Sequence, residues 1–284
     1  MKNYAECIKK YLSVYKTEQF PTLQGGSWRG KGGYKHILPG ICGELNLLEN
    51  YRDVFLNNDL SNIKYHQYFH HLNSSQAMCI NFFFPLIITE KLDILLGELG
   101  LTEDILYDTA KFEKESNIDD KNAIKEKIPE LQQKDTIPTS FDFYFETTKK
   151  KLYFEIKYTE KEFGSAKKDL DKYKLKYEKI YQEAANGKIQ SNTEKIFLDN
   201  YQIMRNLIHV DNDSYIIFVV PEDNKSVYDQ ATEAKNSVMD KYQDKVKTIT
   251  WDRLYEIIEE HEHGFCKTLK KHFEEFKKKY RIKK

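Results

Sequence analysis

Alternating hydrophobic and polar positions predict two consecutive strands in the middle of the chain. Apolar residues occupy every second position over residues 141–145 and again over residues 152–158. A period of two is typical of strands that bury one face. The residues between the two runs, Thr147 to Lys150, are turn-like. We therefore expect a β-hairpin over residues 141–158.

Apolar spacings of three and four predict helices on both sides of this hairpin. The run 215–220 (YIIFVV) is apolar throughout, which indicates a strand covered on both faces. We expect helices over residues 3–16, 45–55, 66–88, 92–99, 162–185 and 191–209 and from about Trp251, strands over 105–113, 215–220 and 246–250, and loops over 24–35 and 114–137.

This succession of helices and strands is that of an α/β protein. With 284 residues, the chain is long enough to bury a core. We expect three parts: an N-terminal extension over residues 1–60 with a basic glycine-rich loop, a core over residues 61–262, and a basic C-terminal helix or tail over residues 263–284.

Charge is unevenly distributed although the formal net charge is zero. Residues 24–35 combine glycines with Arg29, Lys31 and Lys35, and His36 follows directly. Gly32 stands where a phosphate-binding loop of the Walker type would need Ser or Thr, which argues against an ATPase site. A flexible loop contacting nucleic-acid backbone with these side chains is the better interpretation, and the basic tail around residues 277–284 is a second candidate for phosphate contacts.

The four cysteines lie far apart and form no CxxC pair, which favours reduced thiols over disulfides or a zinc site. The first residues have no signal-peptide pattern, and the longest apolar run, residues 82–88, is too short for a bilayer. We therefore expect a cytoplasmic protein without a membrane partner.

The hairpin brings candidate catalytic side chains together. With a four-residue loop, Asp142 faces Glu155, and the period of two places Lys157 on the same face. Two carboxylates this close repel each other unless a divalent cation lies between them, and Mg²⁺ prefers oxygen ligands. A nearby ammonium group orients water, stabilises charge developing on a phosphate or accepts a proton. The alternative is an exposed hairpin with ordinary salt bridges.

The pattern Asp142…Glu155-Ile-Lys157, in a strand–strand–helix context, resembles the PD-(D/E)xK nuclease superfamily. Five stretches further resemble a family of bacterial restriction endonucleases within it, and the resemblance covers about residues 34–255: HILP (36–39), LNSSQA (72–77), FDFYFET (141–147), FEIKYTEKEFG (154–164) and YQIMRN (201–206). The resemblance implies a restriction-endonuclease-like core with a mixed sheet flanked by helices. It also implies Mg²⁺ dependence with Mn²⁺ as substitute, metal binding by Asp142 and Glu155, and a catalytic Lys157.

The sequence departs from the superfamily pattern at two positions. Phe141 stands where many members have Pro, which leaves the metal ligands intact. Many members also carry an acid on the helix before the sheet, where this chain offers Gln76 as a catalytic candidate or a satisfied core amide. Glu113 is then a candidate for the third carboxylate. Gln202 and Arg205 share a helix face and are candidates for holding a phosphate.

The sequence therefore predicts a Mg²⁺-dependent endodeoxyribonuclease of the restriction or defence type, which acts on double-stranded DNA. A homodimer is plausible, because two symmetric sites cut both strands most easily. Two alternatives stay open at this point: a DNA-binding subunit that has lost turnover, and an RNase or single-strand nuclease on the same fold.

Overall fold

The computed structural model describes residues 3–166 and 171–282, and a five-stranded mixed sheet forms its centre. The strand order is β3-β4-β5-β6-β7; β3, β4 and β5 are antiparallel neighbours, whereas β5, β6 and β7 run parallel. The strands are β3 (Ile105–Glu115), β4 (Ser140–Thr147), β5 (Lys151–Ile156), β6 (Ser214–Val220) and β7 (Val246–Thr250).

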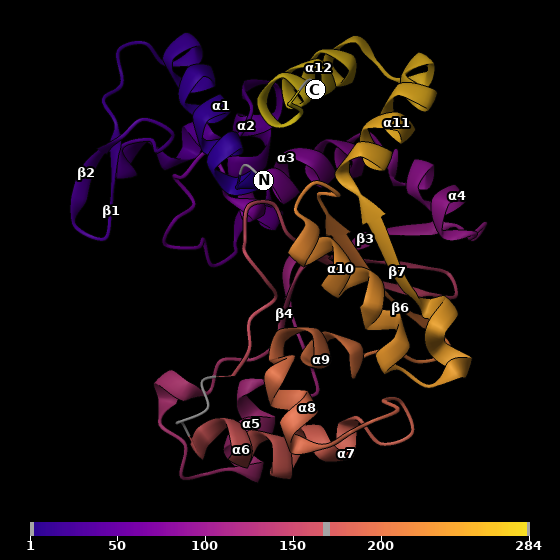
Figure 1. The fold of residues 1–284 in the computed structure, drawn as a ribbon. Coiled ribbons are helices and arrows are strands. Elements are labelled where there is room, and N and C mark those ends of the chain that lie inside the picture. Colours follow the sequence, from indigo (N-terminus) through magenta and orange to yellow (C-terminus); the bar gives the residue numbers. More distant parts are fainter. Residues whose placement is uncertain (1–2, 167–170, 283–284) are drawn as a thin grey trace.

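One face of the sheet is covered by helices from both ends of the chain (Figure 1). The central helix of this layer, α3 (Ser75–Ile88), is buried over most of its length and packs on Phe143 and Phe154. Around it lie α1 (Tyr4–Gln19), α2 (Glu49–Leu56), α4 (Leu96–Leu99), α11 (Trp251–His261) and α12 (Lys267–Tyr280), joined by 3₁₀ turns at Gly40–Asn46, Asp59–Ser61, Leu92–Leu95 and Glu262–Gly264.

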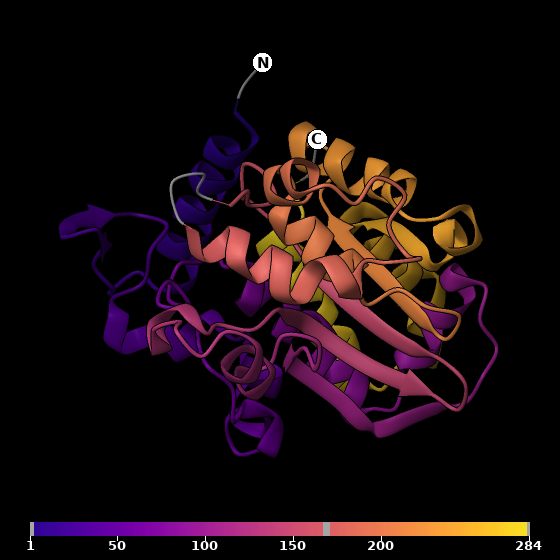
Figure 2. The ribbon, with the colours of Figure 1, turned by 90° about the horizontal axis from the view of Figure 1, so that it is seen from below.

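A second layer covers the opposite face, and its hydrophobic cluster is separate from the first (Figure 2). Ile216, Phe218 and Val220 on β6 pack on these helices, and every residue of β6 is buried because the sheet is covered on both sides. The layer contains α5 (Lys121–Lys127), α6 (Asp171–Lys176), a π-helical turn (Tyr177–Tyr181), α7 (Gln182–Ala184), α8 (Glu194–Asp199), α9 (Tyr201–Leu207) and α10 (Lys225–Ala234), with 3₁₀ turns at Gln133–Asp135, Lys235–Ser237 and Asp240–Lys245.

The architecture confirms the expected fold class, a mixed central sheet flanked by helices with a helical N-terminus and a helical C-terminal segment. The predicted hairpin is also confirmed, since Tyr144 pairs with Tyr153 and Glu146 with Lys151. Residues of α1 and α12 lie in the same hydrophobic cluster as α3. The three-part division of the chain stays a prediction. No helix in the described ranges is long and apolar enough to span a membrane.

The helix predicted over residues 66–88 is wrong in its first half. It begins only at Ser75, where the Ser74 side chain accepts the Ala77 N–H as an N-cap. Residues before this point form turns, because the buried Asn46 amide donates to the carbonyls of Phe69 and His71. These carbonyls are therefore satisfied without a helix.

The long helix predicted over residues 162–185 is also wrong at its start. Gly164 and Ala166 hydrogen-bond through their backbones to Gln202 and Leu198 rather than within a helix. Residues 167–170 lie outside the described residues, and the described helical part begins at Asp171. The helix predicted over residues 191–209 is two helices separated at Asn200, and the Thr193 side chain caps the first.

Two segments predicted to be loops contain regular structure. Residues 24–35 form a hairpin of β1 (Gly26–Trp28) and β2 (Lys31–Tyr34), whose turn residues Arg29 and Gly30 have φ values of 49° and 76°. A two-residue turn with both φ values positive matches the twist of a hairpin. The segment 114–137 completes β3, forms α5 and buries Asp119 fully.

Candidate active site

Three neighbouring strands bring three carboxylates together. Phe112 and Lys114 on β3 pair with Phe143 and Phe141 on β4, so Glu113 between them faces Asp142. On the other side, continuation of the β4–β5 register places Asp142 opposite Glu155. Asp142 therefore lies between Glu113 and Glu155. Its position opposite Glu155 is the one that the hairpin pattern predicts.

The backbone pairing of β4 with β5 ends before Asp142, and the Asp142 side chain accepts the next β5 hydrogen bond in place of a backbone carbonyl. The last pair in register is Phe143 with Phe154, and beyond it Asp142 Oδ2 accepts the Ile156 N–H at 2.6 Å. Phe141 consequently turns to the opposite face, where its ring packs on Tyr153 at a centroid distance of 4.7 Å. The expectation that the phenylalanines of β4 share one face is wrong at Phe141.

Glu155 is buried, and both its oxygens are engaged. Oε1 accepts from Lys157 Nζ and from Gln202 Nε2, each at 2.6 Å, and Oε2 accepts from Asn206 Nδ2 at 3.1 Å. The two amides lie one turn apart on α9, so this short helix holds the carboxylate from the second layer.

Lys157 lies just past the end of β5, and its backbone is fixed from two sides. Its N–H donates to the Val219 carbonyl, and its own carbonyl accepts from Trp251 Nε1 at 3.0 Å. The side chain is buried, and its ammonium lies 5.2 Å from the centre of the Phe163 ring. Burial alone would lower the pKa of Lys157, but the adjacent Glu155 carboxylate raises it overall. Lys157 is therefore a cation in this arrangement.

Glu113 joins the cluster through Gln76, the first-turn residue of α3. Gln76 Nε2 donates to Glu113 Oε1 at 2.7 Å, and Ser140 Oγ donates to Glu113 Oε2 at 3.2 Å. Gln76 is otherwise satisfied, since it accepts the His66 N–H and also donates to the Lys64 carbonyl. Glu113 has a φ of 50°, an uncommon value for a residue other than glycine.

The electrostatics of the cluster favour a bound cation. Burial, followed by the nearby Glu155 and Glu113, raises the pKa of Asp142 well above its ordinary value. Burial also raises the pKa of Glu113. Within the described ranges, no three His, Cys, Asp or Glu side chains are arranged to hold a metal ion between them. Mg²⁺ typically uses only one or two carboxylates and keeps several waters, so Asp142 and Glu155 fit as its ligands by chemistry and number.

The Arg205 side chain, a candidate for holding a phosphate, contacts other residues of the protein instead. Its Nε donates to Thr139 Oγ1 at 2.8 Å, and Nη2 contacts Asp119 Oδ2 at 3.2 Å. Gln202, in contrast, reaches the cluster directly through Glu155. The structure therefore brings Asp142, Glu155, Lys157, Gln202, Gln76 and Glu113 together, and places Arg205 at their edge.

The basic hairpin β1–β2 does not join this cluster. It projects from one side of the molecule, away from β4 and β5 in both views (Figures 1 and 2). Arg29, Lys31 and Lys35 are exposed on it. His36 is half-buried, and burial together with Lys9 lowers its pKa to about 4. His36 is therefore neutral near pH 7.

Two further residues of the site escape prediction from sequence, Asn206 and Ser140. Asn206 stands four positions after Gln202, which is the signal for a shared helix face. Ser140 precedes Phe141 at the start of β4, and nothing in its neighbourhood in the sequence points to Glu113.

Comparison with known protein families gives a match over most of the chain. The sequence model of a family described as restriction endonuclease associating with ARP matches residues 9–281, which is nearly the whole chain. Neither the curated proteins nor the solved structures contain a match to this chain. The matched range includes every candidate residue of the cluster.

Proposed function

Because the chain belongs to the family of restriction endonucleases associating with ARP, we propose that it is a Mg²⁺-dependent endonuclease that hydrolyses double-stranded DNA. The observation that carries this proposal is the meeting of Asp142, Glu155 and Lys157 at the end of β5. Carboxylates that repel one another next to a fixed ammonium group are the parts that phosphodiester hydrolysis needs. Restriction or defence against foreign DNA is the role we propose.

In the proposed mechanism Asp142 and Glu155 would hold Mg²⁺, which would polarise the phosphate and lower the pKa of a water molecule. Gln202 and Asn206 orient the Glu155 carboxylate through their amide donors. Lys157 stabilises the negative charge that grows on the phosphate oxygens in the transition state. Because Glu155 and the two backbone bonds fix Lys157, little reorganisation is needed at the moment of reaction.

Glu113 is the third carboxylate of the proposed site, with Gln76 as its positioning residue. Gln76 stands at the start of α3, and its amide donates a hydrogen bond to the Glu113 carboxylate. A homodimer in which each subunit cuts one strand is consistent with a duplex substrate, and we propose it as the active state.

Metal dependence is the first test. We expect unmethylated plasmid and phage DNA to be cut in Mg²⁺ or Mn²⁺ and to stay intact in EDTA. Without a metal ion, the carboxylates alone cannot polarise the phosphate. In Ca²⁺ we expect bound but uncut DNA, since the looser geometry of Ca²⁺ positions water poorly. Gel electrophoresis reports cleavage, and a mobility shift reports binding. Equal cutting in EDTA would overturn the proposal and leave a binding subunit as the better interpretation.

A second prediction concerns the hairpin β1–β2, whose basic side chains we propose contact backbone phosphate. Replacement of Arg29, Lys31 and Lys35 by Gln should weaken binding to all sequences alike. Each lost phosphate contact should also reduce the slope of log K against log salt by about 0.9. The measurement is the DNA affinity in Ca²⁺ across a series of salt concentrations.

The matched control replaces three lysines around α10 that are also exposed, Lys225, Lys235 and Lys241. We expect the same slope as in the unmodified protein. Equal slopes for the two triple variants would show that the hairpin does not contact phosphate. In the C-terminal segment, Lys279 is buried against Asn46 and Lys277 contacts Glu259, so this segment contributes fewer contacts than its composition predicts.

A further inference from the structure

A pocket of about 320 Å³ opens beside the carboxylate cluster. Its walls come from the start of β4, the segment before α6, α6 itself and α9. The lining residues are Thr139, Ser140, Gly164, Ser165, Tyr173, Tyr201, Gln202, Arg205 and Asn206.

Three lining residues also hold the catalytic acids. Gln202 and Asn206 donate to Glu155, and Ser140 donates to Glu113. An occupant of the pocket therefore lies directly beside the proposed site of bond cleavage. Binding of an occupant would act on the two carboxylates through the side chains that they share with the pocket.

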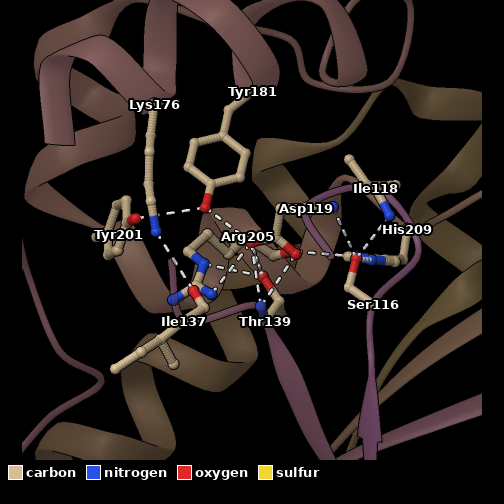
Figure 3. Close-up of polar contacts among 10 residues, drawn as sticks. All are labelled: Ser116, Ile118, Asp119, Ile137, Thr139, Lys176, Tyr181, Tyr201, Arg205 and His209. Carbon is tan, nitrogen blue, oxygen red and sulfur yellow. Dashed lines mark hydrogen bonds and ion pairs between the residues drawn. The ribbon is translucent and has the colours of Figure 1, made fainter. Parts of the chain in front are cut away.

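The charges around the pocket disfavour an anion as the occupant. Arg205 is the charged residue of the lining, and the fully buried Asp119 already neutralises it (Figure 3). Lys176 nearby donates to the Ile137 carbonyl and does not line the pocket. The acids Glu155 and Glu113 accept hydrogen bonds from the lining residues Gln202 and Ser140. A phosphate would therefore meet no unpaired positive charge among the lining residues.

The lining fits a nucleobase instead. Tyr173 and Tyr201 meet edge to face at 5.0 Å, and the Arg205 guanidinium lies 5.1 Å from the Tyr201 ring centre. Aromatic rings and guanidinium planes stack on bases, and side-chain amides such as those of Gln202 and Asn206 read base edges. Within the described part of the chain, the hydroxyls of Ser165 and Tyr173 make no hydrogen bond, so they are available to a ligand.

We propose that this pocket receives one unstacked nucleobase of the DNA strand that is being cut. This inference rests on the proposed function, because the base is supplied by the DNA held at the neighbouring carboxylates. A base that is stacked and paired inside a duplex cannot enter a pocket between the side chains of the protein, so the nucleotide must turn out of the stack. The loss of stacking is offset by contacts with Tyr173, Gln202 and Asn206.

Binding of free bases tests the pocket independently of cleavage. Saturation-transfer NMR with the four deoxynucleosides should show transfer from the protein to the base protons of at least one of them. In Ser165→Trp, the indole fills the pocket and this transfer should be lost. Tyr173→Ala should weaken it by removing the stacking ring. Ser226→Trp, at an exposed position of α10 outside the lining, is the matched control and should retain it.

Inorganic phosphate, followed by its ³¹P line width, serves as the competing probe. Transfer to no deoxynucleoside, or equal transfer in Ser165→Trp and wild type, would overturn the inference. Phosphate broadening that Ser165→Trp abolishes, without any transfer to bases, would make the pocket an anion site instead.

A second experiment connects the pocket to DNA. A duplex carrying the mapped cut site, with 2-aminopurine at one position at a time, should brighten at one position next to the cut in the Ca²⁺ complex. Ser165→Trp should abolish this rise while DNA remains bound. Cleavage in Mg²⁺ without any rise in 2-aminopurine fluorescence would overturn the proposal of a base-binding pocket but not the proposed nuclease function. Absence of cleavage together with base binding by NMR would overturn only the proposed nuclease function.

Discussion

Asp142→Asn, Glu155→Gln and Lys157→Met should each reduce DNA cleavage by at least ~100-fold while DNA binding in Ca²⁺ persists. The reason is that these groups act on charge that develops only in the transition state. Asn at position 142 can still accept the Ile156 N–H, and Met at position 157 keeps the length of the lysine stem. Single-turnover cleavage of a mapped DNA fragment measures the rate.

The control for these variants is Glu146→Gln, on the same strand as Asp142. Glu146 is half-buried, pairs with Lys151 across the hairpin and contacts the Tyr144 hydroxyl rather than the acids. We expect it to cut at the wild-type rate. Wild-type cutting by Lys157→Met would remove lysine from the mechanism, and wild-type cutting by Glu155→Gln would end the assignment of the site.

The hairpin and its register could be predicted because both depend on local pattern. A period of two and a four-residue turn set Tyr144 opposite Tyr153, and this pairing carries Asp142 toward Glu155. The predicted helix boundaries are wrong where a side chain that is distant in the sequence satisfies the hydrogen-bonding groups of the backbone. The Asn46 amide donates to the carbonyls of Phe69 and His71. No pattern within residues 66–88 predicts a hydrogen-bond donor that lies more than twenty residues earlier in the sequence.

The candidate site was predictable only in part for a similar reason. Glu113 reaches Asp142 through the pairing of β3 with β4 and through its own left-handed backbone conformation. Neither feature follows from residue order, because β3 shifts register between Leu106 and Lys111. Arg205 shares its helix with Gln202 as predicted, yet the pairing with Asp119 decides its contacts. Asp119 lies in a segment whose polarity predicts an exposed loop.

The buried pair Asp119–Arg205 should have the largest effect on stability. Asp119 Oδ2 accepts from Arg205, Thr139 and Tyr181, and the Asp119 side chain is fully buried (Figure 3). Asp119→Ala leaves the guanidinium without its counter-charge, which costs about 3–5 kcal/mol of unfolding free energy. Asp229→Ala, which breaks the exposed pair with Lys225, should leave the free energy of unfolding nearly unchanged. Urea denaturation near pH 7 measures both.

The pH dependence of unfolding separates this pair from a simple packing defect. Burial raises the pKa of Asp119, but Arg205 and the hydrogen bonds from Thr139 and Tyr181 lower it overall below its ordinary value. The pair therefore contributes its full stability above the unfolded pKa, near 4, and loses it as pH falls toward the folded pKa. The stability difference between wild type and Asp119→Ala should shrink below about pH 4. The double variant Asp119→Ala/Arg205→Met should regain part of the loss, because it removes the unpaired charge. A difference that stays constant with pH, with no recovery in the double variant, would assign the loss to the cavity alone.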